Sequence, residues 1–77
     1  MSKEIEQKLK TKAATLLNCF GFINVKPSHL TLKDYSHRNG VYDFILVRLE
    51  NTYYQLTYNN DGEVRSWNLL DATEYVD

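Results

Sequence analysis

The chain has 77 residues, a formal net charge of −1 and 43% hydrophobic residues, which limits it to one small domain. A near-neutral charge is not typical of a general nucleic-acid binder. A single cysteine excludes an internal disulfide framework, so a reducing cytoplasm is the expected compartment. The charged N-terminal segment is not a secretion signal, and no apolar run is long enough to cross a membrane.

The first predicted element is an amphipathic helix over about residues 3–20. Apolar residues recur there at spacings of three and four, which places them on one face of a helix. The stripe consists of Ile5, Leu9, Ala13, Leu16, Leu17 and Phe20. Gly21 stands where a glycine commonly ends a helix in the left-handed conformation. Cys19 lies beside the stripe, and a buried structural thiol is expected there.

Residues 22–26 form a short apolar segment that is predicted to be an extra strand or an extended lead-in to the sheet. Pro27 lacks an amide donor, so any strand pairing at this point is confined to a sheet edge or ends there. The first strand proper is expected to begin only at residue 30.

Four strands are predicted, at about residues 30–35, 41–50, 53–59 and 64–70. Asn39-Gly40 and Asp61-Gly62 are preferred two-residue hairpin turns, and Asn51-Thr52 is interpreted as the third turn. The third turn is the weakest, because threonine disfavours positive φ, and a longer loop there would shift the register.

These turns predict a register in which one face of the sheet is apolar. Its two rows are Leu30, Leu49, Tyr54 and Leu69, and Leu32, Val47, Leu56 and Trp67. The next pair along the first hairpin is Asp34 with Ile45. Because three independent turns agree on one buried face, the expected sheet is an antiparallel meander.

The helix can bury its stripe only against this apolar face, because the sequence contains no other large apolar surface. The predicted fold is therefore α+β, with one N-terminal amphipathic helix packed on a four-stranded antiparallel β-meander in the order α-β-β-β-β. It forms one domain over residues 1–77, in which residues 71–77 are a short C-terminal turn or tail.

No catalytic site is predicted. Asp34, Ser36 and His37 have the residue types of a catalytic triad, which must lie within hydrogen-bond reach of one another. The predicted register instead points Asp34 and Ser36 toward the helix and His37 away from it. Asp43 falls near Asp34 at the polar end of the helix-side face, where solvated carboxylates are a simpler interpretation than an acid–base pair.

Metal and cofactor sites are not predicted either. His29, His37 and Cys19 lack the spacing of metal ligands. Each glycine is explained by a helix end or a turn rather than by a phosphate-binding loop, so no cofactor is expected.

The outer face of the predicted sheet gathers apolar residues at one corner. A patch of this kind with a polar rim usually marks an interaction site. The predicted partner-binding residues are Tyr35, His37, Tyr42, Phe44, Leu46 and Val64, with Lys33 and Arg48 at the rim. The alternative is that the tail at 71–77, or the segment around residues 22–26, folds over this corner.

The predicted function is that of a small non-catalytic binding or regulatory protein, which acts on another protein through the outer sheet face or an edge strand. The Asn- and Tyr-rich composition suits an inhibitor encoded by a phage or mobile element. One alternative is a single-stranded nucleic-acid-binding module that stacks bases on Tyr35, Tyr42 and Phe44. The other is a structural homodimer joined by the same patch or by an edge strand. No membrane partner is expected.

Overall fold

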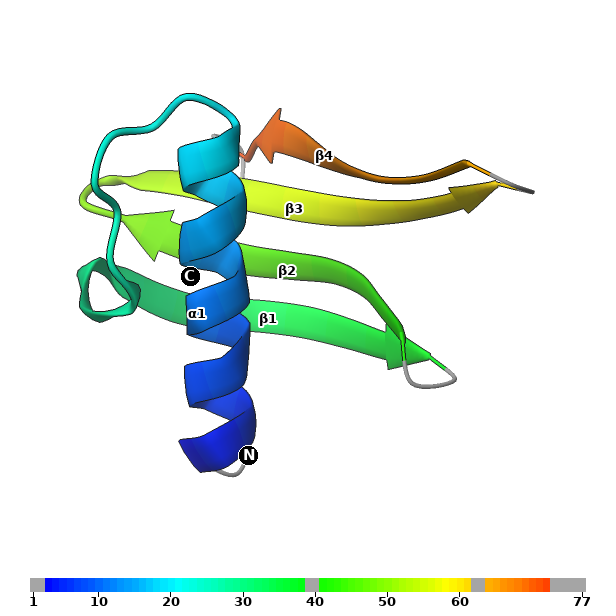
Figure 1. The fold of residues 1–77 in the computed structure, drawn as a ribbon. Coiled ribbons are helices and arrows are strands. Elements are labelled where there is room, and N and C mark those ends of the chain that lie inside the picture. Colours follow the sequence, from blue (N-terminus) through cyan, green and yellow to red (C-terminus); the bar gives the residue numbers. More distant parts are fainter. Residues whose placement is uncertain (1–2, 39–40, 62–63, 73–77) are drawn as a thin grey trace.

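The structure is a computed structural model that describes residues 3–38, 41–61 and 64–72. Its elements, in chain order, are α1 (Lys3–Cys19), the short 3-10 helix η1 (Pro27–His29), β1 (Leu30–Arg38), β2 (Val41–Leu49), β3 (Thr52–Asp61) and β4 (Val64–Asp71). The strands form one antiparallel sheet in the order β1-β2-β3-β4. α1 lies across one face of this sheet (Figure 1), so the predicted α+β meander is confirmed.

α1 is longer than the sheet is wide. Its 17 residues rise about 25 Å, whereas the outermost of four paired strands lie roughly 14 Å apart. The helix runs across the strands and extends beyond them (Figure 1). Leu9, Ala13 and Leu17 in its middle are fully buried, whereas Ile5 and Phe20 at its ends are 39% and 42% exposed. The predicted apolar stripe is therefore correct in the middle and too long at both ends.

The C-terminal end of α1 is closed by a glycine cap, as predicted. Gly21 has a φ of 109°, which side chains other than glycine rarely adopt. The N–H of Phe22 donates to the carbonyl of Leu17 at 3.1 Å, and the N–H of Gly21 donates to the carbonyl of Asn18 at 3.2 Å. This pair of bonds is a Schellman motif, which satisfies carbonyls that the helix end leaves without partners.

The segment after the cap is not a strand. The N–H of Val25 donates to Oδ1 of Asn18 at 2.9 Å, and Nδ2 of Asn18 donates to the carbonyl of Val25 at the same distance. The backbone of Val25 therefore bonds to a helix side chain instead of a neighbouring strand. Pro27 then occupies the first turn of η1, a position that needs no amide donor. The prediction of an extra strand over residues 22–26 is wrong.

The pairing of β1 with β2 begins as predicted. Leu30 lies opposite Leu49 and Leu32 lies opposite Val47. The predicted turn at residues 39–40 lies outside the described residues, although the strand ends that flank it, Arg38 and Val41, are paired.

A register shift then separates Leu32 from Asp34 on β1. Because Lys33 is an extra residue on this strand, Asp34 lies opposite Leu46 and Tyr35 lies opposite Ile45. The predicted pairing of Asp34 with Ile45 is wrong, since a bulge of one residue exchanges the two faces of the strand beyond it.

The other two hairpins are displaced from the predicted register by two residues. Val47 pairs with Tyr54 and Ile45 with Leu56, so Glu50 and Asn51 form the connection between β2 and β3, and Glu50 has a φ of 57°. The predicted turn at Asn51-Thr52 is wrong, because Thr52 is the first residue of β3.

Between β3 and β4, the pairing of Leu56 with Leu69 replaces the predicted pairing of Leu56 with Trp67. β3 extends to Asp61, which pairs with Val64, and residues 62–63 lie outside the described residues. Side chains alternate between the faces of a strand with a period of two, so these displacements change the partners and keep the faces. The predicted apolar face is therefore present in the structure, although different residues pair across the strands.

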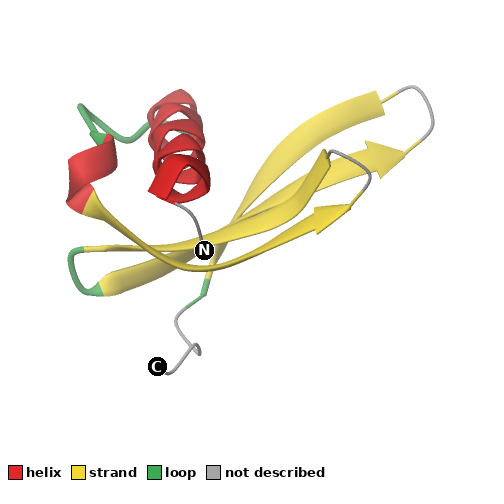
Figure 2. Cartoon of the chain, turned by 90° about the horizontal axis from the view of Figure 1, so that it is seen from below, coloured by secondary structure: helices red, strands yellow, loops and turns green. Residues whose placement is uncertain are grey.

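The core lies between α1 and the apolar face of the sheet. The largest fully buried side chains are those of Leu9, Leu17, Ile45, Val47 and Leu56. Phe22, Tyr35, Trp67 and Leu69 are partly buried and pack against this core. Seen along the sheet, α1 and η1 lie on the same side of it (Figure 2).

Candidate interaction surfaces

The predicted partner-binding patch does not assemble on one face. Tyr35 pairs with Ile45 and packs against the buried core, so it belongs to the helix side of the sheet. Its predicted place on the outer face is wrong, because the bulge at Lys33 shifts the second half of β1 by one residue. The side chains of His37, Tyr42 and Val64 lie outside the described part of the structure.

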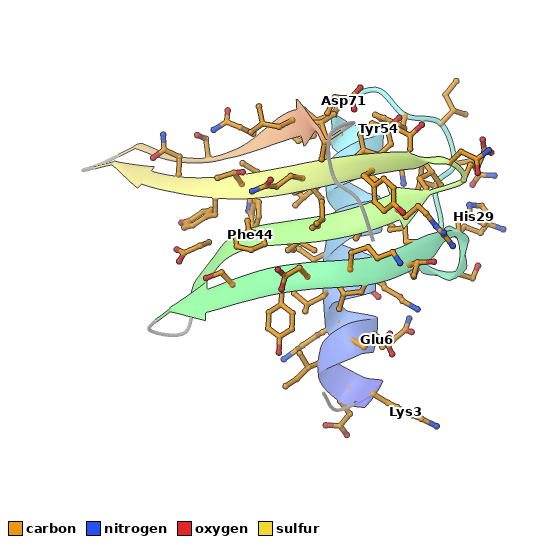
Figure 3. The ribbon with its side chains drawn as sticks, turned by 180° about the vertical axis from the view of Figure 1, so that it is seen from behind. Lys3, Glu6, His29, Phe44, Tyr54 and Asp71 are labelled. Carbon is orange, nitrogen blue, oxygen red and sulfur yellow. The ribbon has the colours of Figure 1, made fainter. Side chains whose placement is uncertain are left out.

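Phe44, Leu46 and Arg48 alternate along β2 with the core residues Ile45 and Val47, so they project from the outer face. Figure 3 shows Phe44 on the face of the sheet away from α1. Leu46 is only 6% exposed, and Phe44 and Arg48 are partly buried. The described part of the predicted patch therefore offers a half-buried ring and a polar rim rather than a broad apolar area.

The bulge also turns Asp34 and Ser36 to the outer face, opposite Leu46 and Phe44, whereas both were predicted on the helix side. Asp34 accepts a hydrogen bond at Oδ1 from the N–H of Tyr35 at 2.8 Å. Oγ of Ser36 donates to Oδ2 of Asp43 at 3.2 Å. Both carboxylates thus bind neighbouring groups of the sheet. The predicted place of this acid–base candidate on the helix side is therefore wrong, because Asp34 lies on the outer face and Asp43 is bonded to Ser36 of that face.

The structure bears on two predictions, the burial of Cys19 and the absence of a metal site. Cys19 is an exposed free thiol, so the expected buried thiol is wrong, because this position in the last helical turn lies off the buried stripe. Within the described residues, no group of three or more His, Cys, Asp or Glu side chains could hold a metal ion.

The most exposed large apolar side chain among the described residues is one that the sequence analysis did not single out. Ile23 is 91% exposed, at the tip of the connection between α1 and η1. Its neighbour Asn24 has a φ of 56°, which turns the backbone so that Ile23 points outward while Val25 is buried. Asparagine adopts a positive φ more readily than most residues, so the turn at Asn24 had a signal in the sequence.

The loop that carries Ile23 is attached to the molecule on both sides of the tip. Before it, the ring of Phe22 contacts the ring of Tyr54 edge-to-face, with centroids 5.1 Å apart and planes at 86°. After it, Val25 is joined to Asn18 by the two hydrogen bonds of 2.9 Å. The tip is therefore exposed although both of its ends are fixed. We call residues 20–25 the Ile23 loop; it also includes Phe20, which is partly exposed.

β4 forms a second candidate surface. It pairs with β3 on one side and is an outer strand of the sheet. Leu70 on the outer face of this strand is 55% exposed. On the opposite face, Trp67 and Leu69 are only partly buried, because α1 packs more closely on β1 and β2 than on β4.

None of the described helices is long and apolar enough to span a membrane. Comparisons of the chain with protein-family models, with curated proteins and with solved structures give no match.

Proposed function

We propose that this chain is a small non-catalytic protein that works by binding another protein, and that the Ile23 loop makes the contact. The observation that carries the proposal is the 91% exposure of Ile23 on a loop whose two ends are fixed. The lone cysteine supports a reducing cytoplasm as its place of action.

An isolated exposed apolar residue is ordinary on protein surfaces, so exposure alone does not support this proposal. The attachment of the loop adds the second argument. Binding costs free energy for every loop and side chain that becomes ordered, and a segment that is already held in place avoids most of that cost. A branched aliphatic side chain at such a tip can fill an apolar pocket of a partner with little further ordering.

The neighbouring residues suit a protein partner better than a nucleic acid. Phe20 adds a second exposed apolar side chain to the Ile23 loop, and an apolar centre with a polar surround is the usual anatomy of protein interfaces. The nucleic-acid alternative relied on Tyr35, Tyr42 and Phe44 as stacking platforms, and Tyr35 lies on the helix side.

The test compares wild-type protein with Ile23→Ser, each immobilised as the full chain and exposed to the same cell lysate. We expect one protein to be retained by the wild type and its retention to fall by on the order of tenfold in the variant, as for an interface hot spot. Because Ile23 makes little contact with the core, the free energy of unfolding should change by less than about 0.5 kcal/mol.

Leu70→Ser is the matched control, since it makes the same kind of change at an exposed aliphatic residue on a different surface. It should retain the partner at the wild-type level. Equal retention by Ile23→Ser and wild type would remove the Ile23 loop from the interface and overturn the proposal.

A further inference from the structure

The two edges of the sheet differ in their ability to pair with another strand. The pairing of β1 with β2 has two register shifts, of which the first is a bulge at Lys33 on β1 and the second places an extra residue, Asp43, on β2. Lys33 and Asp34 also put two charges in the middle of β1. Bulges and charges of this kind are devices by which edge strands avoid pairing. β4 pairs with β3 in one unbroken register from Val64 to Asp71, and its central residues, Ser66 to Leu70, carry no charge. Of the two edges, β4 is the one that suits a further strand.

Among the described residues, β4 pairs with no strand other than β3, and one hydrogen bond shows which of its backbone groups point away from β3. The N–H of Ala72 donates to the carbonyl of Tyr53 at 2.9 Å. In an antiparallel ladder, successive residues point their N–H and C=O groups alternately toward the neighbouring strand and away from it. The residues that point their backbone groups toward the open edge are therefore Arg65, Trp67, Leu69 and Asp71.

A second copy of β4 can bond to these groups in an antiparallel arrangement only if edge-pointing residues lie opposite one another. The register centred on Asn68 satisfies this condition. It places Trp67 opposite Leu69 of the second copy, and Leu69 opposite the second copy's Trp67. It also places Arg65 opposite Asp71 of the second copy, twice, because a two-fold axis repeats each contact.

This register pairs matching residue types at the helix-side positions. Trp67 and Leu69 lie on the helix side, where each is only partly covered within one chain. In register, the oppositely charged residue types Arg65 and Asp71 are paired on each side of these two positions, and opposite charges directly across two strands stabilise the pairing. Leu70 on the outer face, which is 55% exposed, lies opposite Ser66. When two copies of β4 run antiparallel in this register, each charged residue of one copy thus lies opposite a residue of opposite charge in the other.

Most of β4 lies to one side of α1 (Figure 1). α1 crosses the sheet beside the C-terminal end of β4 (Figure 1), whereas the two-fold axis passes through Asn68 nearer its middle. The two helices therefore lie on the same face of the joined sheet, on opposite sides of the axis.

We propose that two copies of this chain associate through β4, antiparallel and centred on Asn68, to form one continuous sheet twice as wide as that of a single chain. Ile23 takes no part in this pairing, although Phe22 of the same loop contacts Tyr54, which pairs with Asp71 at the end of β4. Either proposal can therefore fail without the other. Ile23→Ser should leave the association of the two copies unchanged.

The first test needs no substitution. The mass in solution should rise from 9.1 kDa toward twice that value as the protein is concentrated, measured by sedimentation. Over the same range, hydrogen exchange followed by NMR should show the amides of Trp67 and Leu69 becoming protected, because these point to the open edge. The amides of Ser66, Asn68 and Leu70 bond to β3 and should be protected at every concentration. A mass that stays at 9.1 kDa, or association without protection of Trp67 and Leu69, would overturn the proposal.

The second test exchanges charges. Asp71→Arg places like charges opposite one another at two symmetry-related points and should weaken association on the order of tenfold. Arg65→Asp should do the same. The double variant Arg65→Asp/Asp71→Arg restores opposite charges and should return the dissociation constant to within about threefold of wild type.

Glu4→Arg, at the far end of α1, is the control with the same change in net charge as Asp71→Arg, and it should associate like the wild type. If the single variants associate as tightly as the wild type, or if the double variant associates no better than the single variants, the register is wrong.

Discussion

Lys33 shows how one residue can change a predicted surface. Without a bulge, Tyr35 would lie on the outer face, and Asp34 and Ser36 would face the helix. With Lys33 as an extra residue in β1, Tyr35 packs against the core and Asp34 lies opposite Leu46. The bulge thus removes an aromatic side chain from the outer face, where the binding patch was predicted, and packs it, partly buried, against the core opposite Ile45.

Thr57 offers a test of packing on that outer face. Its Oγ1 is buried and has no hydrogen-bond partner among the described residues, which costs free energy because the hydroxyl has lost its contact with water. Thr57→Val keeps the branched shape and removes the hydroxyl, so the free energy of unfolding should rise by about 1 kcal/mol. Urea denaturation measures this change.

Thr31→Val on the exposed part of β1 is the control, and it should change the free energy of unfolding by less than about 0.5 kcal/mol. A fall in stability for Thr57→Val would mean that the hydroxyl is satisfied, for instance by an ordered water molecule.

At the scale of elements, the connection from α1 to β1 depends on a side chain of the helix. Asn18 occupies the last full turn of α1 and bonds to both backbone groups of Val25. The Schellman motif at Gly21 reverses the chain so that Val25 can reach Asn18. The helix end and the loop therefore form one unit, which holds Ile23 in its exposed position.

Asn18→Ala should loosen this unit. The loss of two hydrogen bonds to the backbone of a buried residue should lower the free energy of unfolding by about 1–2 kcal/mol, less the small gain from the higher helix propensity of alanine. Amide exchange at Val25 should accelerate, because its N–H loses its acceptor. Urea denaturation and hydrogen exchange measure the two effects.

Gln7→Ala is the matched control, because it also removes an amide side chain from α1 at an exposed position. It should leave both the stability and the exchange at Val25 close to wild type. Unchanged exchange at Val25 in Asn18→Ala would contradict the role assigned to Asn18.

At the scale of the whole molecule, stability rests on a single contact between two layers. α1 is the only α-helix among the described residues, and it covers one face of the sheet. The fully buried residues of α1 and of the central strands β2 and β3 meet there. A core of this size leaves a small margin of stability, so the loss of one large buried side chain is a large fraction of the total.

Leu9→Ala and Ile5→Ala compare two positions on the same helix face. Leu9 is fully buried, so its truncation should lower the free energy of unfolding by about 2–5 kcal/mol. A substantial fraction of the molecules should then be unfolded. Ile5 lies where α1 extends past the sheet and is 39% exposed, so its truncation should cost less than about 1.5 kcal/mol. Thermal and urea denaturation followed by circular dichroism measure both. Similar losses at the two positions would mean that α1 does not extend past the core.

The sequence by itself determined the secondary-structure elements and which residues lie on the apolar face of the helix and of the later strands. The helix follows from apolar spacing and its end from Gly21, both of which are local signals along the chain. The apolar face of the meander follows from alternation with a period of two, and this pattern is unchanged when a strand moves by two residues. For that reason the faces of β3 and β4 were predicted correctly, although their partners were not.

Only the tertiary structure decided the bulge at Lys33, the pairs across the two later hairpins and the exposure of Ile23. Each depends on contacts between residues far apart in the sequence. Tyr58 beside Trp67, with centroids 5.2 Å apart, belongs to the observed register of β3 and β4, and Phe22 reaches Tyr54 only across the fold. The exposure of Ile23 likewise depends on the contacts on both sides of it, where Phe22 packs on Tyr54 and Val25 bonds to Asn18. Local patterns specify which residues face inward, and packing between layers selects among the registers that those patterns allow.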